Sequence, residues 1–108
     1  MTPEDQYTIS QWAEDTFGKT SGARAITRVN QEVAELLVLA STTSGLDNKM
    51  RMQSECADIL ITLYRVASVL GFDLHSAVDD KMEINRARKW KLDGSGCGQH
   101  IPEDSNAV

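Results

Sequence analysis

Residues 59–70 read ILITLYRVASVL, and nine of these twelve residues are apolar. At about 100° per residue, the apolar side chains cover most of the circumference of a helix, so such a helix must be buried on more than one side. A single helical hairpin buries a helix on one side only. The segment therefore predicts an all-α fold in which a partner subunit covers this helix.

The sequence on either side of this segment extends the helical prediction in both directions. Apolar residues upstream recur at spacings of three and four, and residues 41–45 interrupt them. Thr2 is expected to cap the first helix, with Pro3 at its first position, and Asp47 and Asp73 are expected to cap the last two. No stretch alternates with the two-residue period of a strand. The predicted helices cover residues 3–17, 23–40, 47–70 and 74–92.

Length and charge narrow the class of protein further. With 108 residues, the chain is expected to form one helical domain over residues 1–93, followed by a flexible, glycine-containing tail over residues 94–108. The 16 acidic residues outnumber the 11 basic ones, which argues against a nucleic-acid-binding protein. No signal segment is visible, and the longest apolar run, residues 36–40, is too short for a membrane span. We therefore expect a cytoplasmic protein with no membrane partner.

Two carboxylate pairs share one spacing on adjacent predicted helices. Glu32 and Glu35 lie three residues apart, as do Glu55 and Asp58, so each pair occupies one helix face beside the apolar stripe. Taken alone, either pair could be ordinary solvated surface acids. Four converging carboxylates would repel one another, and a hard divalent cation such as Mg²⁺ relieves that repulsion. The repeat on two helices thus favours a magnesium site.

Basic residues gather in the last predicted helix, where five of the eleven in the chain lie within residues 81–91. Lys81 and Asn85 are one helical turn apart and Arg88 continues that face, an arrangement suited to a polyphosphate. Cations at the negative end of a helix dipole are the alternative, and they explain Lys81 and Asn85 poorly. Trp12 and Trp90 could stack on a base or simply fill the interior, whereas Phe17 is expected in the core.

Three segments together resemble a known family. EVAELLVLA at residues 32–40, ECADILITLYRVASVLGFDL at residues 55–74 and KMEINRARKW at residues 81–90 look like the MazG-type all-α nucleoside triphosphate pyrophosphohydrolases. The resemblance covers roughly residues 24–92 and is closest to the small stand-alone members. Each motif is weak alone, and the combination is fairly specific.

The resemblance implies a four-helix-bundle-type fold completed by oligomerisation, as a homodimer or homotetramer with active sites shared between subunits. It also implies conversion of a nucleoside triphosphate to its monophosphate and pyrophosphate. This activity would clear unwanted deoxynucleotides from the nucleotide pool. Lys81 and Asn85 would hold phosphate. Mn²⁺ could substitute for the Mg²⁺ cofactor. The implied ligands of this metal ion are Glu32, Glu35, Glu55 and Asp58.

The residues are compatible with direct attack of water on the α-phosphorus. Glu35 is our candidate for accepting the proton of that water, and Lys81 and Arg88 would stabilise the charge of the leaving pyrophosphate. Two alternatives stay open at this stage: a phosphoribosyl-ATP pyrophosphatase, and a non-catalytic helical interaction module. Base preference, dimer versus tetramer, the number of metal ions and the role of the tail are not determined by spacing.

Overall fold

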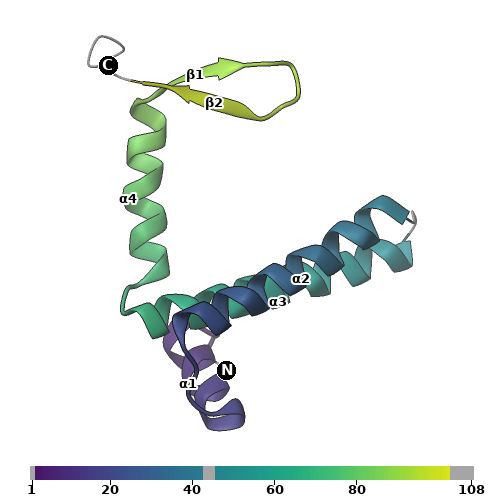
Figure 1. Cartoon of the computed structure of the whole chain (residues 1–108), viewed down its shortest axis with the longest axis vertical. Coiled ribbons are helices and arrows are strands. Elements are labelled where there is room, and N and C mark those ends of the chain that lie inside the picture. The colour runs from purple at the N-terminus through teal and green to yellow at the C-terminus, as the bar shows by residue number, and fades with distance from the viewer. Residues whose placement is uncertain (1, 43–45, 103–108) are drawn as a thin grey trace. The chain divides into compact units, whose positions relative to one another are not determined.

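The computed structural model describes residues 2–42 and 46–102. The chain forms two compact units, Met1–Leu74 and His75–Val108 (Figure 1). The first unit contains helices α1 to α3, and the second contains nearly all of helix α4 and a two-stranded sheet. The elements are α1 Gln6–Phe17, α2 Gly22–Thr42, α3 Leu46–Leu70, α4 Leu74–Ala87, β1 Lys89–Leu92 and β2 Gly98–Ile101.

Helices α2 and α3 lie side by side as an antiparallel pair (Figure 1). The start of α2 meets the end of α3 at Gly22, where an added Cβ would come within 2.7 Å of Leu70 Cδ2. Near the opposite ends of the two helices, Asn48 Nδ2 donates a hydrogen bond of 3.2 Å to the carbonyl of Leu39. Because glycine has no side chain, Gly22 leaves room for the side chain of Leu70 at this point.

Helix α1 begins later than its sequence suggests. Thr2 was the expected cap, but the helix starts at Gln6 and is capped by Asp5. The reason is a reciprocal capping box, in which Thr8 N donates to Asp5 Oδ1 at 2.8 Å and Asp5 N donates to Thr8 Oγ1 at 3.0 Å. The two hydrogen bonds satisfy the backbone N–H groups of Asp5 and Thr8, which a cap at Thr2 would leave without these partners.

Glutamine 6 then joins α1 to the far end of α3. Gln6 Nε2 donates to Ser68 Oγ at 3.2 Å and to the carbonyl of Phe72 at 2.8 Å, and Gln6 Oε1 accepts from Leu74 N at 2.8 Å. The predicted stops at Gly18 and Gly71 are confirmed, with φ angles of 84° and 87°. The hydrogen bonds of Gln6 fix α1 against α3, so that α1 forms one wall of the groove described below.

The last predicted helix is shorter than expected and is followed by strands that the sequence did not predict. Helix α4 ends at Ala87 instead of continuing to Leu92, and residues 89–92 pair antiparallel with residues 98–101. Gly94 and Gly96, both with φ of 86°, allow the chain to reverse between the two strands. Residues 43–45, in the predicted break, and residues 103–108, in the predicted tail, lie outside the described residues. The division at residue 93 stays a prediction.

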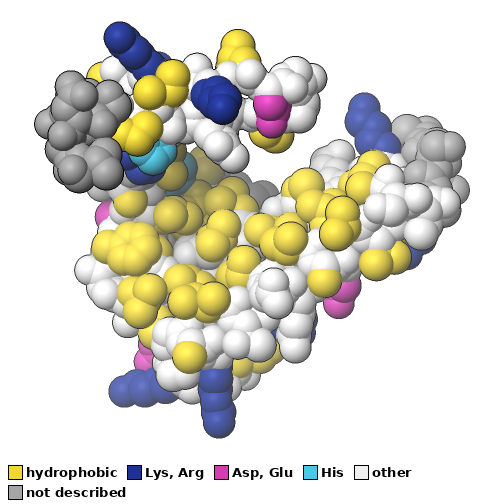
Figure 2. Space-filling view, turned by 45° about the horizontal axis from the view of Figure 1, so that its top comes forward, with side chains coloured by type: hydrophobic (Ala, Val, Ile, Leu, Met, Phe, Trp, Pro, Cys, Tyr) yellow, Lys and Arg dark blue, Asp and Glu magenta, His cyan; other side chains and the backbone are white. Residues whose placement is uncertain are grey.

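The buried apolar core of the described residues is small, and none of its members has a large side chain that is fully enclosed. Larger apolar side chains lie on the surface, where they cover much of the face seen in Figure 2. The all-α class is confirmed, with the small sheet as an addition. None of the described helices combines the length and hydropathy that crossing a bilayer requires. The core residues are Ala13, Ala25, Tyr64, Val66 and Ala67.

Candidate functional site

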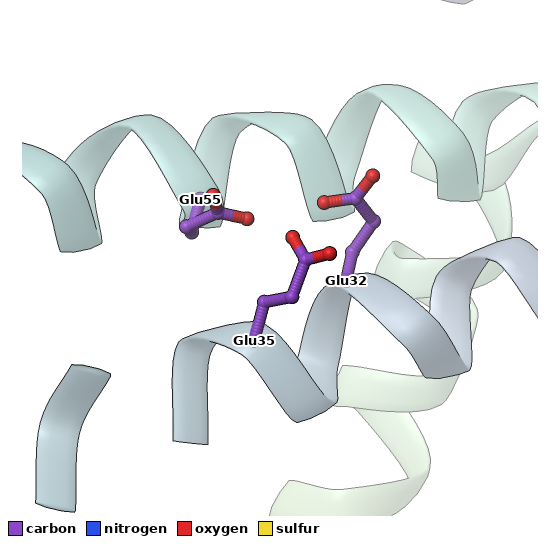
Figure 3. A group of neighbouring side chains, drawn as sticks. All are labelled: Glu32, Glu35 and Glu55. Atoms are coloured by element: carbon purple, nitrogen blue, oxygen red, sulfur yellow. The ribbon is translucent and has the colours of Figure 1, made fainter. Parts of the chain in front are cut away.

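Three of the four predicted carboxylates converge between α2 and α3. Glu32 and Glu35 extend from α2, Glu55 extends from α3, and the three side chains point toward one another (Figure 3). One carboxylate oxygen of each lies within 4.8 Å of those of the other two. The spacing of three residues on α2 aligns its two acids on one face, and the antiparallel pairing with α3 supplies the third.

The three acids differ in their exposure to water and in their hydrogen bonding. Glu32 is buried, Glu55 is half-buried and Glu35 is exposed. Burial, a hydrogen bond shared with Glu32, and the negative charges of Glu35, Glu32 and Asp58 raise the pKa of Glu55 above its ordinary value. Glu55 Oε2 is enclosed and has no hydrogen-bond partner in the structure. The group is therefore short of positive charge and of hydrogen-bond donors.

Asp58, the fourth predicted acid, lies next to this group. It is one turn from Glu55 on α3, and its charge contributes to the raised pKa of that residue. Asp58 is absent from the trio whose oxygens meet within 4.8 Å, and instead it lines a groove together with Glu32. It therefore stands where the acidic group opens into the groove.

The groove has a volume of about 500 Å³ and is formed by α1, α2 and α3. Trp12 and Phe17 of α1 contribute aromatic rings, which meet edge to face with their centroids 5.5 Å apart. Arg65 of α3 lies over the Phe17 ring, 5.8 Å from its centroid, and donates a hydrogen bond to the carbonyl of Gly18. A hollow of this size with few polar anchors is typical of small-molecule sites.

The side chains that line the groove change from basic to acidic along α2 and α3. On α2, the lining residues Arg24, Arg28 and Glu32 follow one another at intervals of one turn, so they span about 12 Å at 1.5 Å per residue. Because α2 and α3 are antiparallel, Asp58 lies toward the Glu32 end and Arg65 lies toward the Arg24 end. Arginines and acids thus follow one another along the groove, and the rings of Trp12 and Phe17 line it as well.

The remaining predicted residues belong to the second unit. Lys81 is exposed on α4, and Asn85 and Arg88 are half-buried. Trp90 Nε1 donates a hydrogen bond of 3.0 Å to the carbonyl of Asn85, and the Trp90 ring meets His100 edge to face at 6.4 Å. Trp90 therefore packs at the base of the hairpin. The roles of Lys81, Asn85 and Arg88 in binding phosphate, and of Trp90 in stacking on a base, stay predictions.

Several groove residues were missed by the sequence reasoning. Phe17 was expected in the core but is 66% exposed and lines the groove, so that prediction was wrong. Arg24, Arg28 and Arg65 also line the groove. The sequence interpretation had instead assigned phosphate binding to the basic residues after position 80. The spacing of four residues that connects Arg24, Arg28 and Glu32 was the available signal, because it places them on one helix face.

Two curated relatives share most of this chain. A dATP/dGTP diphosphohydrolase of Salmonella phage PMBT28 is 38% identical over 96 residues, which are 89% of this chain and 30% of the relative. A dATP/dGTP diphosphohydrolase of cyanophage S-2L is 30% identical over 99 residues, which are 92% of this chain and 87% of the relative. The chain thus spans less than a third of the Salmonella phage relative and nearly all of the cyanophage one. No family model matches the chain.

A solved structure gives the same result for the fold. The cyanophage S-2L MazG-like pyrophosphohydrolase, bound to dGDP and three catalytic Mn²⁺ ions per active site, matches with a TM-score of 0.72 and 30% identity. The match covers 92% of this chain and 91% of that one.

Fold, site and relatives together define the class as all-α hydrolases that act on nucleotide phosphoanhydride bonds. Within that class, the chain belongs to the MazG-like pyrophosphohydrolase family. The resemblance noted in its sequence is confirmed. Among the described residues, the trio Glu32, Glu35 and Glu55 could hold a metal ion.

Proposed function

We propose that this protein hydrolyses purine deoxynucleoside triphosphates to monophosphate and pyrophosphate, with Mg²⁺ or Mn²⁺ as cofactor, and so removes these nucleotides from the pool. The observation that carries the proposal is the convergence of three carboxylates within 4.8 Å beside the groove. The activities named for the two phage relatives support the choice of dATP and dGTP. A phosphoribosyl-ATP pyrophosphatase is less well supported, because neither relative carries that name.

The donor set fits a hard divalent cation. Carboxylate oxygens are the preferred ligands of Mg²⁺ and are also common ligands of Mn²⁺. The unpartnered Glu55 Oε2 has lone pairs that no protein donor satisfies, and burial, together with the neighbouring carboxylates, raises the pKa of Glu55. Glu32, Glu35, Glu55 and Asp58 would hold the cation, which would neutralise substrate charge and lower the pKa of water.

The chain's own residues divide the remaining work. Trp12 lines the groove, where its ring would stack on the base. Water would attack the α-phosphorus and break the bond between the α- and β-phosphates, while Glu35, the most exposed of the three acids, accepts its proton. Lys81, Asn85 and Arg88 would bind the phosphates and stabilise the departing pyrophosphate.

Oligomerisation belongs to the same proposal. Large apolar side chains of α2 and α3 are exposed in the single chain, among them Leu37 at 65% and Leu60 at 46%. Burial of such surface against a second copy would supply the apolar core that one chain lacks. We therefore propose a homodimer or homotetramer in the cytoplasm, with no nucleic acid and no membrane as partner.

A nucleotide panel tests the proposed activity. The protein is incubated with each of the common deoxynucleoside and nucleoside triphosphates, with Mg²⁺, Mn²⁺ or excess chelator, and pyrophosphate and orthophosphate are measured separately. We expect pyrophosphate from dATP and dGTP with either ion and none with chelator. Orthophosphate as the only product would contradict the proposed reaction, and no product from any nucleotide would favour the non-catalytic interaction module.

A further inference from the structure

Arg28 forms an ion pair with Glu32, a member of the acidic group. Arg28 Nη2 lies 2.9 Å from Glu32 Oε1, and the two residues are one helical turn apart on α2. Arg28 also lines the groove, between Arg24 on one side and Glu32 on the other. Its guanidinium therefore compensates the charge of Glu32 in the metal-free protein.

The two partners are held very differently. The Glu32 side chain is 8% exposed and is fixed between α2 and α3, whereas the Arg28 side chain is 62% exposed. The exposed guanidinium can change its rotamer, whereas the buried carboxylate of Glu32 stays in place. Because an unpaired buried charge is costly, Arg28 leaves Glu32 readily only when another cation takes its place there.

A divalent cation at the acidic group would compete with Arg28 for the same carboxylate. Such a cation carries two positive charges and binds directly to oxygen, so it would take the place of the guanidinium on Glu32. The displaced guanidinium would still be tethered to the lining of the groove, one helical turn from Glu32. The phosphates of a nucleotide that binds in the groove with its phosphates at the carboxylates would lie within reach of this guanidinium.

We propose that Arg28 is a phosphate-binding residue that rests on Glu32 in the metal-free protein and transfers to the substrate's phosphates when a cation occupies the acids. This role rests on the proposed function of the groove. A guanidinium forms paired hydrogen bonds to two phosphate oxygens, which an ammonium group cannot reproduce. The exchange links phosphate binding to cation binding. The groove would therefore bind phosphate tightly only when a metal ion occupies the acidic group.

The test is a set of binding measurements that need no turnover. Isothermal titration calorimetry with Mn²⁺ present follows the α,β-methylene analogue of dATP and, separately, deoxyadenosine. The variants are Arg28→Gln, Arg28→Lys and the matched control Arg51→Gln, which removes an exposed arginine of α3 outside the groove lining. Melting temperature and Mn²⁺ affinity without nucleotide, the latter by electron paramagnetic resonance, are recorded for each.

Arg28→Gln is expected to bind the analogue at least about tenfold more weakly, as expected for loss of a charge-assisted pair of hydrogen bonds. Its affinity for deoxyadenosine should stay within twofold of wild type. It should bind Mn²⁺ alone at least as tightly as wild type, since the competing guanidinium is gone. Arg28→Lys should be intermediate, and Arg51→Gln should match wild type in every measurement.

Two results would overturn the role of Arg28 while leaving the proposed function intact. One is unchanged affinity of Arg28→Gln for the analogue. The other is a parallel loss of analogue, deoxyadenosine and Mn²⁺ binding, which would show a merely structural role. A wild-type protein that binds no nucleotide in the presence of Mn²⁺ would overturn the proposed function itself, and the role of Arg28 with it.

Discussion

The two compact units of the chain carry different halves of the predicted chemistry. In residues 1–74, the acids Glu32, Glu35 and Glu55 meet through contacts made entirely within the unit. In residues 75–108, Lys81 and Asn85 share a face of α4, but no acid of the trio belongs to that unit. An acidic site is thus built by one helix pair, whereas the phosphate-binding roles of Lys81 and Asn85 stay predictions.

Removing a carboxylate from the first unit is expected to have the largest effect. Glu35→Gln and Asp58→Asn should each lower kcat by about 10³-fold or more, because charge stabilisation at the phosphate is lost. Steady-state pyrophosphate release measures this, and circular dichroism checks that the helices remain. Asp79→Asn, on the exposed surface of α4, is the matched control. Full activity in either site variant would remove that residue from the metal site.

Removing a cation from the second unit should have the next largest effect. Lys81→Ala is expected to lower kcat/KM by about 10²-fold, through lost stabilisation of the leaving pyrophosphate. Lys49→Ala, which removes an exposed lysine from α3, should leave kcat/KM unchanged. Equal kcat/KM values for the two variants would show that Lys81 makes no phosphate contact. The second unit would then contribute no cation to the reaction through this residue.

Substitutions of the two tryptophans test which unit contacts the base. Trp12→Ala should raise KM about tenfold, since stacking of an aromatic ring on a base contributes roughly 1–3 kcal/mol, and Trp12→Phe should recover most of that loss. Trp90→Phe should change KM less than twofold, because Trp90 already donates to the Asn85 carbonyl and packs on His100. A larger KM effect at Trp90 than at Trp12 would reverse this assignment.

The smallest expected effect is the pH dependence of stability in the metal-free protein. Because the folded state raises the pKa of Glu55, the native state binds more protons than the unfolded state between the ordinary value of 4.5 and the raised one. Stability should therefore fall as pH rises through this window, and it should recover as pH falls toward 4.5. Denaturant titrations at pH 5 and pH 7 measure the difference.

Glu55→Gln is the control for this pH effect, because it keeps the shape of the side chain without its charge. The difference in unfolding free energy between the two pH values should shrink in this variant, and added Mn²⁺ should reverse its sign in the wild-type protein. A slope that is identical in wild type and Glu55→Gln would show that other groups set the pH dependence.

Much of the first unit could be predicted, because its organisation depends on local rules. Helical periodicity, glycine stops and the three-residue spacing of the acids each act within one helix, and the antiparallel pairing follows from their connection. The cap at Asp5 was missed, since Thr2 offers a similar side chain and only the reciprocal bond with Thr8 decides between them. Phe17 was misplaced because its apolar character says nothing about which surface it faces.

In the second unit, local rules did not predict the strands or the end of the last helix. The four residues of β1 are too few to display an alternating pattern, and they become a strand only because the turn at Gly94 and Gly96 brings β2 beside them. Helix α4 consequently ends at Ala87, before the basic run is complete. The groove arginines, in contrast, lay in a recognisable pattern with Glu32, but their importance depends on α1 closing over them.

The central claim is that water attacks the α-phosphorus of a nucleotide held between the groove and the carboxylates. The most direct test is hydrolysis of dGTP with Mn²⁺ in ¹⁸O-labelled water, followed by mass spectrometry of both products. We predict one ¹⁸O atom in dGMP and none in the pyrophosphate. Label in the pyrophosphate would show attack at the β-phosphorus, and dGDP with labelled orthophosphate would show attack at the γ-phosphorus; either result would contradict the account.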